Sequence, residues 1–220
     1  LGISMATKVN QLFASAGTSF RLRSAAGLPP EWAEEVTLAQ LVNHTGLGMH
    51  YVNGVPLSST FPSVLTLISG TEHVPAPYGY ASLELTKQPG TAFNYSGGGF
   101  LVLQHLIELR EGVPIAEVMD AELQSAGNLV SLGLSFSHDL ADKPFAFGYN
   151  DVGIAYPDGG RLNFPPLAAG ASGTAAALAD WLRQLALAYK HREGCGAISH
   201  DVAKAMLDNP SDLGALDFMK

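Results

Sequence analysis

The residues best suited to chemistry in this sequence are Tyr95 and Ser96, which stand directly before three consecutive glycines in the stretch QPGTAFNYSGGGF (88–100). A phenol, with a pKa of about 10, becomes a useful proton acceptor only when positive charges nearby stabilise the phenolate. A Pro-Gly turn before Tyr95 and a helix start after it predict a short rigid loop beside free backbone N–H groups. The alternative is that Tyr95 belongs to the core and that the glycines only permit a tight turn.

Other catalytic and metal-binding signatures are incomplete. A nucleophile elbow needs Gly-x-Ser-x-Gly, but the stretch around Ser96 lacks the first glycine and the stretch around Ser172 lacks the last. His44 and His50 flank a glycine loop without a nearby carboxylate, which argues against a metal site. Cys195 is the only cysteine, so the sequence has neither an internal disulfide nor a cysteine-based metal cluster. We therefore expect no metal and no other cofactor.

The composition is that of a globular protein. The chain has 220 residues, of which 47% are hydrophobic and 15% are charged, and its net charge is −8. This length is enough for a real core, and the negative charge argues against a nucleic-acid surface. The apolar runs fall far short of the roughly 20 residues that span a bilayer. We expect neither a nucleic-acid partner nor a membrane span, and the sequence leaves the compartment open.

Helical spacing dominates the chain. Apolar periodicity predicts a helix over 98–110. It begins within the glycine stretch and ends at Gly112. Further helices are predicted over 35–42, 62–69, 114–123, 174–193 and from 199 onward. The longest of them is predicted to carry one broad apolar face, made of Leu178, Trp181, Leu182, Leu185 and Tyr189. Residues 133–168 offer only short strand-like pieces, such as 145–149. We expect a mainly α fold with short strands and no large sheet within this chain.

Capping signals mark several of these helix ends. Thr37 and Gln40 have the spacing of a capping box, in which each side chain bonds the other residue's backbone N–H. Gly70 is placed to stop the second helix. Ser199 is placed to cap the last one, with Asp201 in its first turn.

Four stretches resemble, in order, the serine β-lactamase-related family, which includes class C β-lactamases, penicillin-binding-protein-like hydrolases and related esterases. They are VTLAQLVNHTGLG (36–48), PGTAFNYSGGGFLVLQHLIE (89–108), PPLAAGASGTAAALADWLRQLALAY (165–189) and ISHDVAKAML (198–207). Each stretch is weak evidence alone, but together they cover most of 36–207 in the family order. The resemblance implies the α+β fold of β-lactamases and transpeptidases, of which this chain resembles the central helical lobe.

The resemblance also implies site residues. Tyr95 matches the family's catalytic tyrosine, and Gly97 stands where the family's box carries an asparagine that contacts substrate. Ser96 and Gly97 are then expected to border the substrate, and His50 is expected to line the pocket. We further expect the three glycines to keep the wall beside the phenol open to an acyl group. On that hypothesis Gly97→Leu would block the substrate and spare the fold.

Two other boxes of the family are not found here. Its nucleophile lies in a Ser-x-x-Lys box, and no serine in this sequence has a lysine three residues later. The segment KVNQLFASAG (8–17) resembles one that follows this box in the family, and DLGALDFMK (212–220) resembles the lead-in to a Lys-Thr-Gly or His-x-Gly box. We therefore expect residues 1–220 to form a single β-lactamase-related domain without most of the sheet-forming ends. Missing segments or a second chain would complete the sheet.

The function that the resemblance implies is acyl transfer. A serine attacks the carbonyl of a small-molecule ester, amide or lactam, and water resolves the acyl-enzyme. Tyr95 would act in this scheme as the general base, or as the acid for the leaving group. The alternative is a non-catalytic remnant or binding lobe of the same fold. A Ser-x-x-Lys box upstream and a Lys/His-x-Gly box downstream in the reading frame would favour the enzyme.

Overall fold

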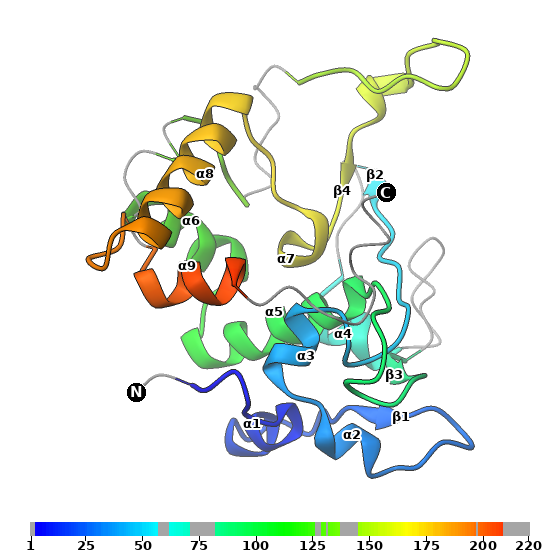
Figure 1. Cartoon of the computed structure of the whole chain (residues 1–220). Helices are drawn as coiled ribbons and strands as arrows, with labels where there is room; N and C mark the ends of the chain where they lie inside the picture. The colour runs from blue at the N-terminus through cyan, green and yellow to red at the C-terminus, as the bar shows by residue number, and fades with distance from the viewer. Residues whose placement is uncertain are drawn as a thin grey trace.

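The structure, a computed structural model, describes residues 3–56, 62–70, 82–125, 129–130, 132–136, 145–196 and 198–208. Helices dominate these residues (Figure 1). They are α1 (Val9–Ser15), α2 (Trp32–Glu35), α3 (Leu38–Val42), α4 (Val64–Ser69), α5 (Gly97–Glu111), α6 (Ile115–Ser125), α7 (Pro166–Ala169), α8 (Ala175–Lys190) and α9 (His200–Leu207), with a 3₁₀ turn over Pro157–Gly160. The mainly α character predicted from the sequence is confirmed.

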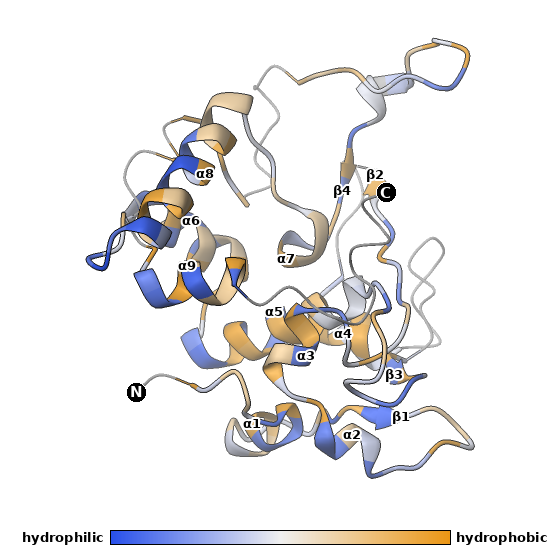
Figure 2. Ribbon diagram, viewed as in Figure 1, coloured by the Kyte–Doolittle hydropathy of each residue, from blue (hydrophilic) through white to orange (hydrophobic). Residues whose placement is uncertain are grey.

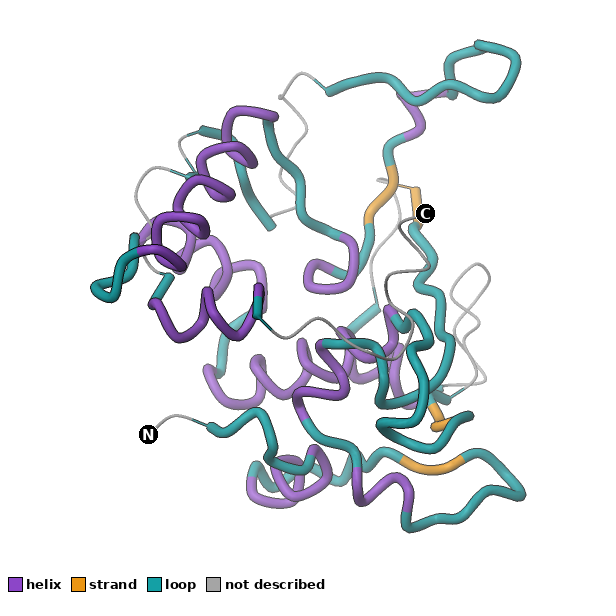
Figure 3. The backbone as a smooth tube through the Cα atoms, in the orientation of Figure 1, coloured by secondary structure: helices purple, strands orange, loops and turns teal. Residues whose placement is uncertain are grey.

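Strands are short wherever the chain is described (Figure 3). β1 (Arg23–Ser24) pairs in parallel with β3 (Glu84–Leu85), and β2 (Val55–Pro56) pairs antiparallel with β4 (Leu162–Asn163). No larger sheet forms among the described residues. The strand-like piece predicted over 145–149 is not a strand, because only Tyr149 pairs, in a single bridge to Ala155.

Helix α5 is the centre of this arrangement. It packs against α3, α4, α6 and α7, and Figure 2 shows hydrophobic residues gathered along α4 and α5. Both ends of α5 are capped, and the end at Gly112 is as predicted. The Ser96 hydroxyl caps the first turn, and Gly112 ends the helix in the left-handed conformation with φ 72°.

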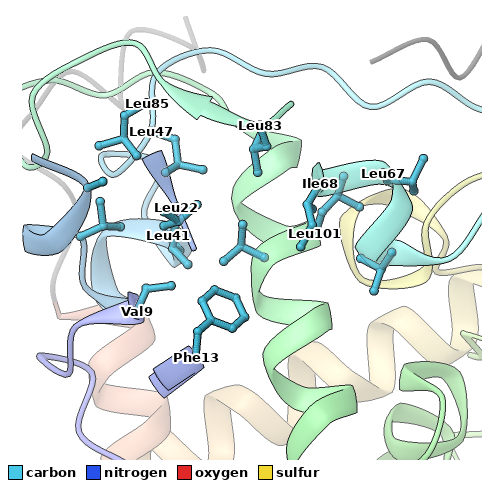
Figure 4. Close-up of a cluster of buried hydrophobic side chains, with 14 of the residues drawn as sticks. Val9, Phe13, Leu22, Leu41, Leu47, Leu67, Ile68, Leu83, Leu85 and Leu101 are labelled. Carbon is cyan, nitrogen blue, oxygen red and sulfur yellow. The ribbon is translucent and has the colours of Figure 1, made fainter. Parts of the chain in front are cut away.

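The main core lies beside α5 (Figure 4). Phe13 of α1, Leu41 of α3 and Val102 of α5 are almost completely buried. Phe20 packs edge-on against Phe13, with ring centroids 5.0 Å apart. Four short helices from the first half of the chain, α1 to α4, therefore contribute to the core beside α5, the helix that follows the tyrosine box.

The capping box of α3 is present as predicted, with both the Thr37 and the Gln40 side chains bonded to the other residue's backbone. The helix is shorter than predicted, however, because it begins at Leu38 and not at residue 35. Val36 is extended, with φ −63° and ψ 126°. Its carbonyl accepts the Val9 N–H at 2.8 Å, and its side chain is fully buried, so tertiary packing interrupts the helix there.

Helix α4 begins two residues later than predicted. Ser63 is its N-cap and accepts the Thr66 N–H, so Pro62 lies outside the first turn. The predicted stop at Gly70 is confirmed, with φ 59°. The N-cap of α9 at Ser199 is confirmed as well.

The apolar face predicted for α8 is wrong in part. Leu185 is buried, but Leu178, Leu182 and Tyr189 are 54%, 51% and 39% exposed. The buried stripe is made instead of Ala177, Gln184, Leu185 and Ala188. The small alanines allow α9 to pack closely on α8, with Ala188 and Ala203 in one cluster. Close approach through small residues, and not burial of the largest side chains, sets the orientation of this helix.

Candidate active site

Two residues of one loop, His44 and His50, hold the main chain around Tyr95. The Asn94 N–H donates to the His44 carbonyl at 2.8 Å. The His50 N–H donates to the Tyr95 carbonyl at 3.2 Å, and the Gly97 N–H donates to the His50 carbonyl at 2.8 Å. Tyr95 lies just before Ser96, the N-cap of α5, as predicted. Its backbone is therefore fixed from both sides, while its side chain is half-buried.

The phenol ring of Tyr95 packs against two other rings. His44 lies 4.9 Å away between centroids with the planes tilted by 35°, and Tyr51 lies 5.8 Å away with a tilt of 36°. His44 also contacts the rings of Phe93 and Phe100. The other rings are half-buried and Tyr51 is 64% exposed, so this aromatic group reaches the surface.

His44 acts as a hydrogen-bond acceptor toward the helix start. The Ser96 N–H donates to its Nδ1 at 3.1 Å. Burial lowers the pKa of His44, so the ring is neutral at pH 7 and Nδ1 keeps the lone pair that this bond requires. His44 also has φ 60°, in the left-handed region. That conformation is uncommon for a residue with a side chain.

His50 holds the Ser96 side chain. Its Nε2 lies 3.0 Å from the Glu84 carbonyl, and its Nδ1 lies 3.2 Å from Ser96 Oγ. Nδ1 also lies 3.2 Å from the Gly48 carbonyl. A carbonyl only accepts, and one faces each ring nitrogen, so these contacts select no single tautomer of the neutral ring. Burial also lowers the pKa of His50, which favours this neutral form over the doubly protonated ring.

Ser96 is enclosed by these contacts. It is only 2% exposed, and its hydroxyl oxygen also accepts the Gly99 N–H at 3.1 Å. The hydroxyl is thus used twice within the protein, once as the acceptor of the helix cap and once in the hydrogen bond with His50 Nδ1. The Ser96–His50 pair joins the helix start to the His50 loop. The expected role of Ser96 at the substrate stays a prediction.

The glycines after Ser96 are sites of close packing. A Cβ added at Gly97 would lie 2.5 Å from Val52 Cγ2, and one at Gly98 would lie 2.4 Å from Leu83 Cδ1. Both glycines are buried. The expectation that Gly97→Leu spares the fold is therefore wrong, because the side chain would displace Val52 in the loop that leads into β2. Contact of Gly97 with substrate stays a prediction.

Comparison with known proteins places the chain. The sequence model of the family described as beta-lactamase matches residues 22–197. The chain belongs to the beta-lactamase family. No curated protein matches it.

Solved structures with the same fold include three proteins of different description. One is the octameric penicillin-binding protein homologue from Pyrococcus abyssi, at 17% identity and a TM-score of 0.52, covering 93% of this chain and 43% of that one. The penicillin-binding protein from Bacillus halodurans has 19% identity and a TM-score of 0.50, covering 94% of this chain and 62% of that one. EstCE1, a hydrolase with promiscuous acyltransferase activity, has 18% identity and a TM-score of 0.55, covering 93% of this chain and 56% of that one. At these identities the likeness shows the fold. This beta-lactamase family member spans about half the length of those chains.

A pocket of about 350 Å³ opens beside the tyrosine box of this beta-lactamase family member. Its walls are Met49, His50, Tyr51, Val52, Leu67, Ser82, Leu83, Glu84, Thr86, Gly98 and Leu101. His50 and Gly98 both form part of its wall. The expectation that His50 lines the substrate pocket stays a prediction. Tyr95 does not line this pocket, although its ring contacts that of Tyr51 at the rim.

Neither a metal site nor a membrane helix is found in the described part of the chain. No three or more His, Cys, Asp or Glu residues there are grouped to hold a metal ion. None of the described helices has the length and apolarity needed to cross a membrane.

Sequence reasoning missed the part that His44 plays. It considered this residue only as a metal ligand, whereas the structure places it against Tyr95 and Ser96. The signal was present in the His-Thr-Gly segment of the first family-like stretch. Its meaning depends on contacts between residues 44 and 96, which no local pattern reports.

Proposed function

We propose that this chain supplies the proton-transfer tyrosine of a serine hydrolase that acts on an ester, amide or lactam. The proposal is supported by membership of the beta-lactamase family and by the match of Tyr95 to the family's tyrosine box. The substrate is a small acyl compound, and the reaction passes through an acyl-enzyme.

The observation that carries the proposal is the contrast between the backbone and the side chain of Tyr95. Three hydrogen bonds tie this segment to the loop 44–50. The Asn94 and Ser96 N–H groups donate to that loop, and the Tyr95 carbonyl accepts an N–H from it. The side chain itself is half-buried and lies in a group of rings that reaches the surface. A general acid or base must be held in place and still be reached by the group that it serves.

The proton steps follow from this role. As the serine oxygen bonds to the carbonyl carbon, its proton passes to a base, and the leaving group takes a proton as its bond to that carbon breaks. Tyr95 is the candidate for one or both transfers. The nucleophile would be a serine in a Ser-x-x-Lys box, which these 220 residues do not contain.

That missing box favours a second candidate function. A lobe of this fold without the nucleophile would bind a ligand or a partner and would not turn over. The two candidates differ in whether the natural polypeptide that contains this segment hydrolyses an activated ester such as a nitrophenyl acyl ester.

The test is Tyr95→Phe in that natural polypeptide, with Tyr51→Phe as the matched control. Both changes remove one phenolic oxygen from the same group of rings, and Tyr51 is the more exposed of the two. We expect Tyr95→Phe to lower kcat/KM by about 10²–10⁴-fold, the usual contribution of a general acid or base. Tyr51→Phe should stay within a small factor, and both should melt near the parent temperature. A Tyr95→Phe enzyme that keeps its full rate would return Tyr95 to a structural role.

A separate experiment concerns the 220 residues alone. A serine-reactive fluorophosphonate should label none of their serines stoichiometrically, because Ser96 is enclosed and no serine has a lysine three residues on. Stoichiometric labelling of one serine, read by mass spectrometry, would reveal a nucleophile within this chain.

A further inference from the structure

His44 touches every part of the segment that carries Tyr95. The two residues that flank the tyrosine both donate their backbone N–H groups to His44. The Asn94 N–H bonds to the His44 carbonyl at 2.8 Å, and the Ser96 N–H bonds to His44 Nδ1 at 3.1 Å. Between these two bonds, the imidazole packs on the Tyr95 ring at 4.9 Å. One residue thus fixes the backbone before the phenol, the backbone after it and one face of the ring.

His44 makes these contacts from a backbone conformation that is uncommon for residues with a side chain. The left-handed region is disfavoured for an L-residue with a side chain, and glycine or asparagine adopts it more readily. His44 has φ 60°. The turn is anchored to α3 by the Thr45 N–H, which donates to the Gln40 carbonyl at 2.9 Å. A strained residue that persists in this way is a reason to look for a role beyond turn formation.

We propose that His44 is a positioning residue for Tyr95, holding the phenol in its working orientation through the Ser96 N–H and the packing of the two rings. This inference rests on the proposed function of Tyr95 in proton transfer. A displacement of about 1 Å at a reacting group can cost 10²-fold in rate, so the bond to Ser96 would matter for turnover far more than for stability.

The accepting nitrogen sets the chemistry of this role. Only a neutral imidazole has a lone pair on Nδ1, and a doubly protonated ring would point an N–H group at the Ser96 N–H. Burial keeps the pKa of His44 below its ordinary value, which maintains the accepting form near neutral pH. The variants below therefore separate the acceptor, the ring and the backbone conformation.

Three substitutions divide these contributions. His44→Asn keeps an acceptor, because asparagine Oδ1 occupies the same bonded position as histidine Nδ1, and asparagine tolerates the left-handed region. His44→Phe keeps a ring but loses the acceptor. His44→Gly relieves the backbone but loses both. Thr37→Ala is the stability control, since it removes a cap of α3 in the same region without touching His44 or Tyr95.

In the natural polypeptide we expect His44→Gly and His44→Phe to lower kcat by about 10–100-fold with KM little changed. His44→Asn should recover most of that loss in kcat. Thr37→Ala should leave kcat unchanged although it lowers the free energy of unfolding. A purely structural His44 would instead give rates that follow stability, with His44→Gly the mildest variant because it relieves the strain.

Amide hydrogen exchange of Ser96 gives a readout that does not depend on activity. Exchange should be at least about tenfold faster in the glycine and phenylalanine variants than in the parent, because the N–H loses its acceptor. The asparagine variant should keep the protection.

The outcomes distinguish this proposal from the proposed function. If Tyr95→Phe abolishes turnover while His44→Gly and His44→Phe keep the parental kcat, the positioning role is wrong and the function of Tyr95 stands. If Tyr95→Phe keeps the full rate, the proposed function fails. Unchanged Ser96 exchange in His44→Gly would overturn the positioning role in either case.

Discussion

The core around α5 and the pair of helices α8 and α9 use apolar residues in opposite ways. Around α5, residues from Val9 to Val102 form one continuous buried cluster. The α8–α9 pair buries mainly small residues, with Ala188 and Ala203 beside Leu185. Its larger apolar side chains are about half exposed, namely Leu178 and Leu182 on α8 and Val202, Met206 and Leu207 on α9.

This difference teaches how far helical periodicity can be trusted. Apolar spacing shows that a helix has a face suited to burial, but burial depends on what packs against that face. For α5 the partners lie within the described chain. For α8 the close partner is α9, and small residues decide the contact. The same kind of pattern thus predicted the surroundings of one helix correctly and of the other only in part.

The largest expected difference between the two regions is in the cost of truncating a large side chain. Phe13→Ala should lower the free energy of unfolding by about 3–5 kcal/mol, because the ring is fully buried. Leu182→Ala should change it by less than about 0.5 kcal/mol, because Leu182 is 51% exposed and alanine favours helix. Urea unfolding measures both values. Similar losses for the two variants would break the comparison.

Adding a methyl group at the start of α5 should also be costly. Gly98→Ala brings a Cβ to 2.4 Å from Leu83 Cδ1 and 3.0 Å from His50 Cβ. We expect a loss of about 1–3 kcal/mol from overpacking. Gly173→Ala, just before α8, is the matched control, since its Cβ would meet the end of the Leu134 side chain at 3.1 Å and that side chain can shift. A Gly98→Ala protein as stable as the parent would contradict the close packing.

Sequence patterns predicted what local rules decide. The Gly112 end of α5, the capping box of α3 and the family membership all follow from residue types at short spacing. The rest depends on contacts between distant segments. The break at Val36 follows from its bond to Val9, and the role of the glycines follows from Val52 and Leu83. The bond between His44 and Ser96 spans 52 residues, so no local spacing could reveal it.

The two regions should lose stability in different ranges of pH. Burial lowers the pKa of His44, His50 and His105 in the α5 region, and the Glu108 carboxylate partly opposes this for His105. Their folded values lie below the unfolded value of 6.5, so the unfolded state binds more protons. The contribution of these histidines to the free energy of unfolding is therefore complete above pH 6.5 and is lost as the pH falls below it.

In the α8–α9 region the shifted acids are Asp180 and Asp208. Hydrogen bonds, first from Gln184 and then from Arg183, lower the pKa of Asp180, and a hydrogen bond from Lys204 lowers that of Asp208. Their contribution is present above the ordinary aspartate value of 3.8 and is lost only as the pH falls below it. The stability of the α8–α9 region should thus change little between pH 7 and 5, whereas the stability of the α5 region should fall.

The two tryptophans make this difference measurable. Trp32 packs against the α5 core, and Trp181, a residue of α8, packs against the cluster of Leu185, Ala188 and Ala203. Single-tryptophan variants therefore report each region separately. The urea midpoint read by Trp32 should fall between pH 7 and 5, and the one read by Trp181 should change less. His105→Phe should reduce the fall, because His105 Nε2 is buried without a partner among the described residues and lies against the rings of Phe13 and Phe20. A flat Trp32 midpoint would contradict the histidine assignment.

The smallest expected effects concern the helix caps, and they ask whether α9 unfolds with the rest. Thr37 accepts the Gln40 N–H at 3.3 Å, and Ser199 accepts the Val202 N–H at 3.2 Å. Each cap contributes about 1 kcal/mol to its own helix. Helix α3 is embedded in the main core, so Thr37→Ala should lower the global midpoint by the full amount. Helix α9 buries only Ala203, so Ser199→Ala should mostly increase local fraying. The free energy of unfolding reported by Trp32 should change by less than about 0.5 kcal/mol. Amide exchange would locate the loss in residues 200–207. An equal fall of the Trp32 midpoint in both variants would instead make α9 part of the same cooperative unit as α5.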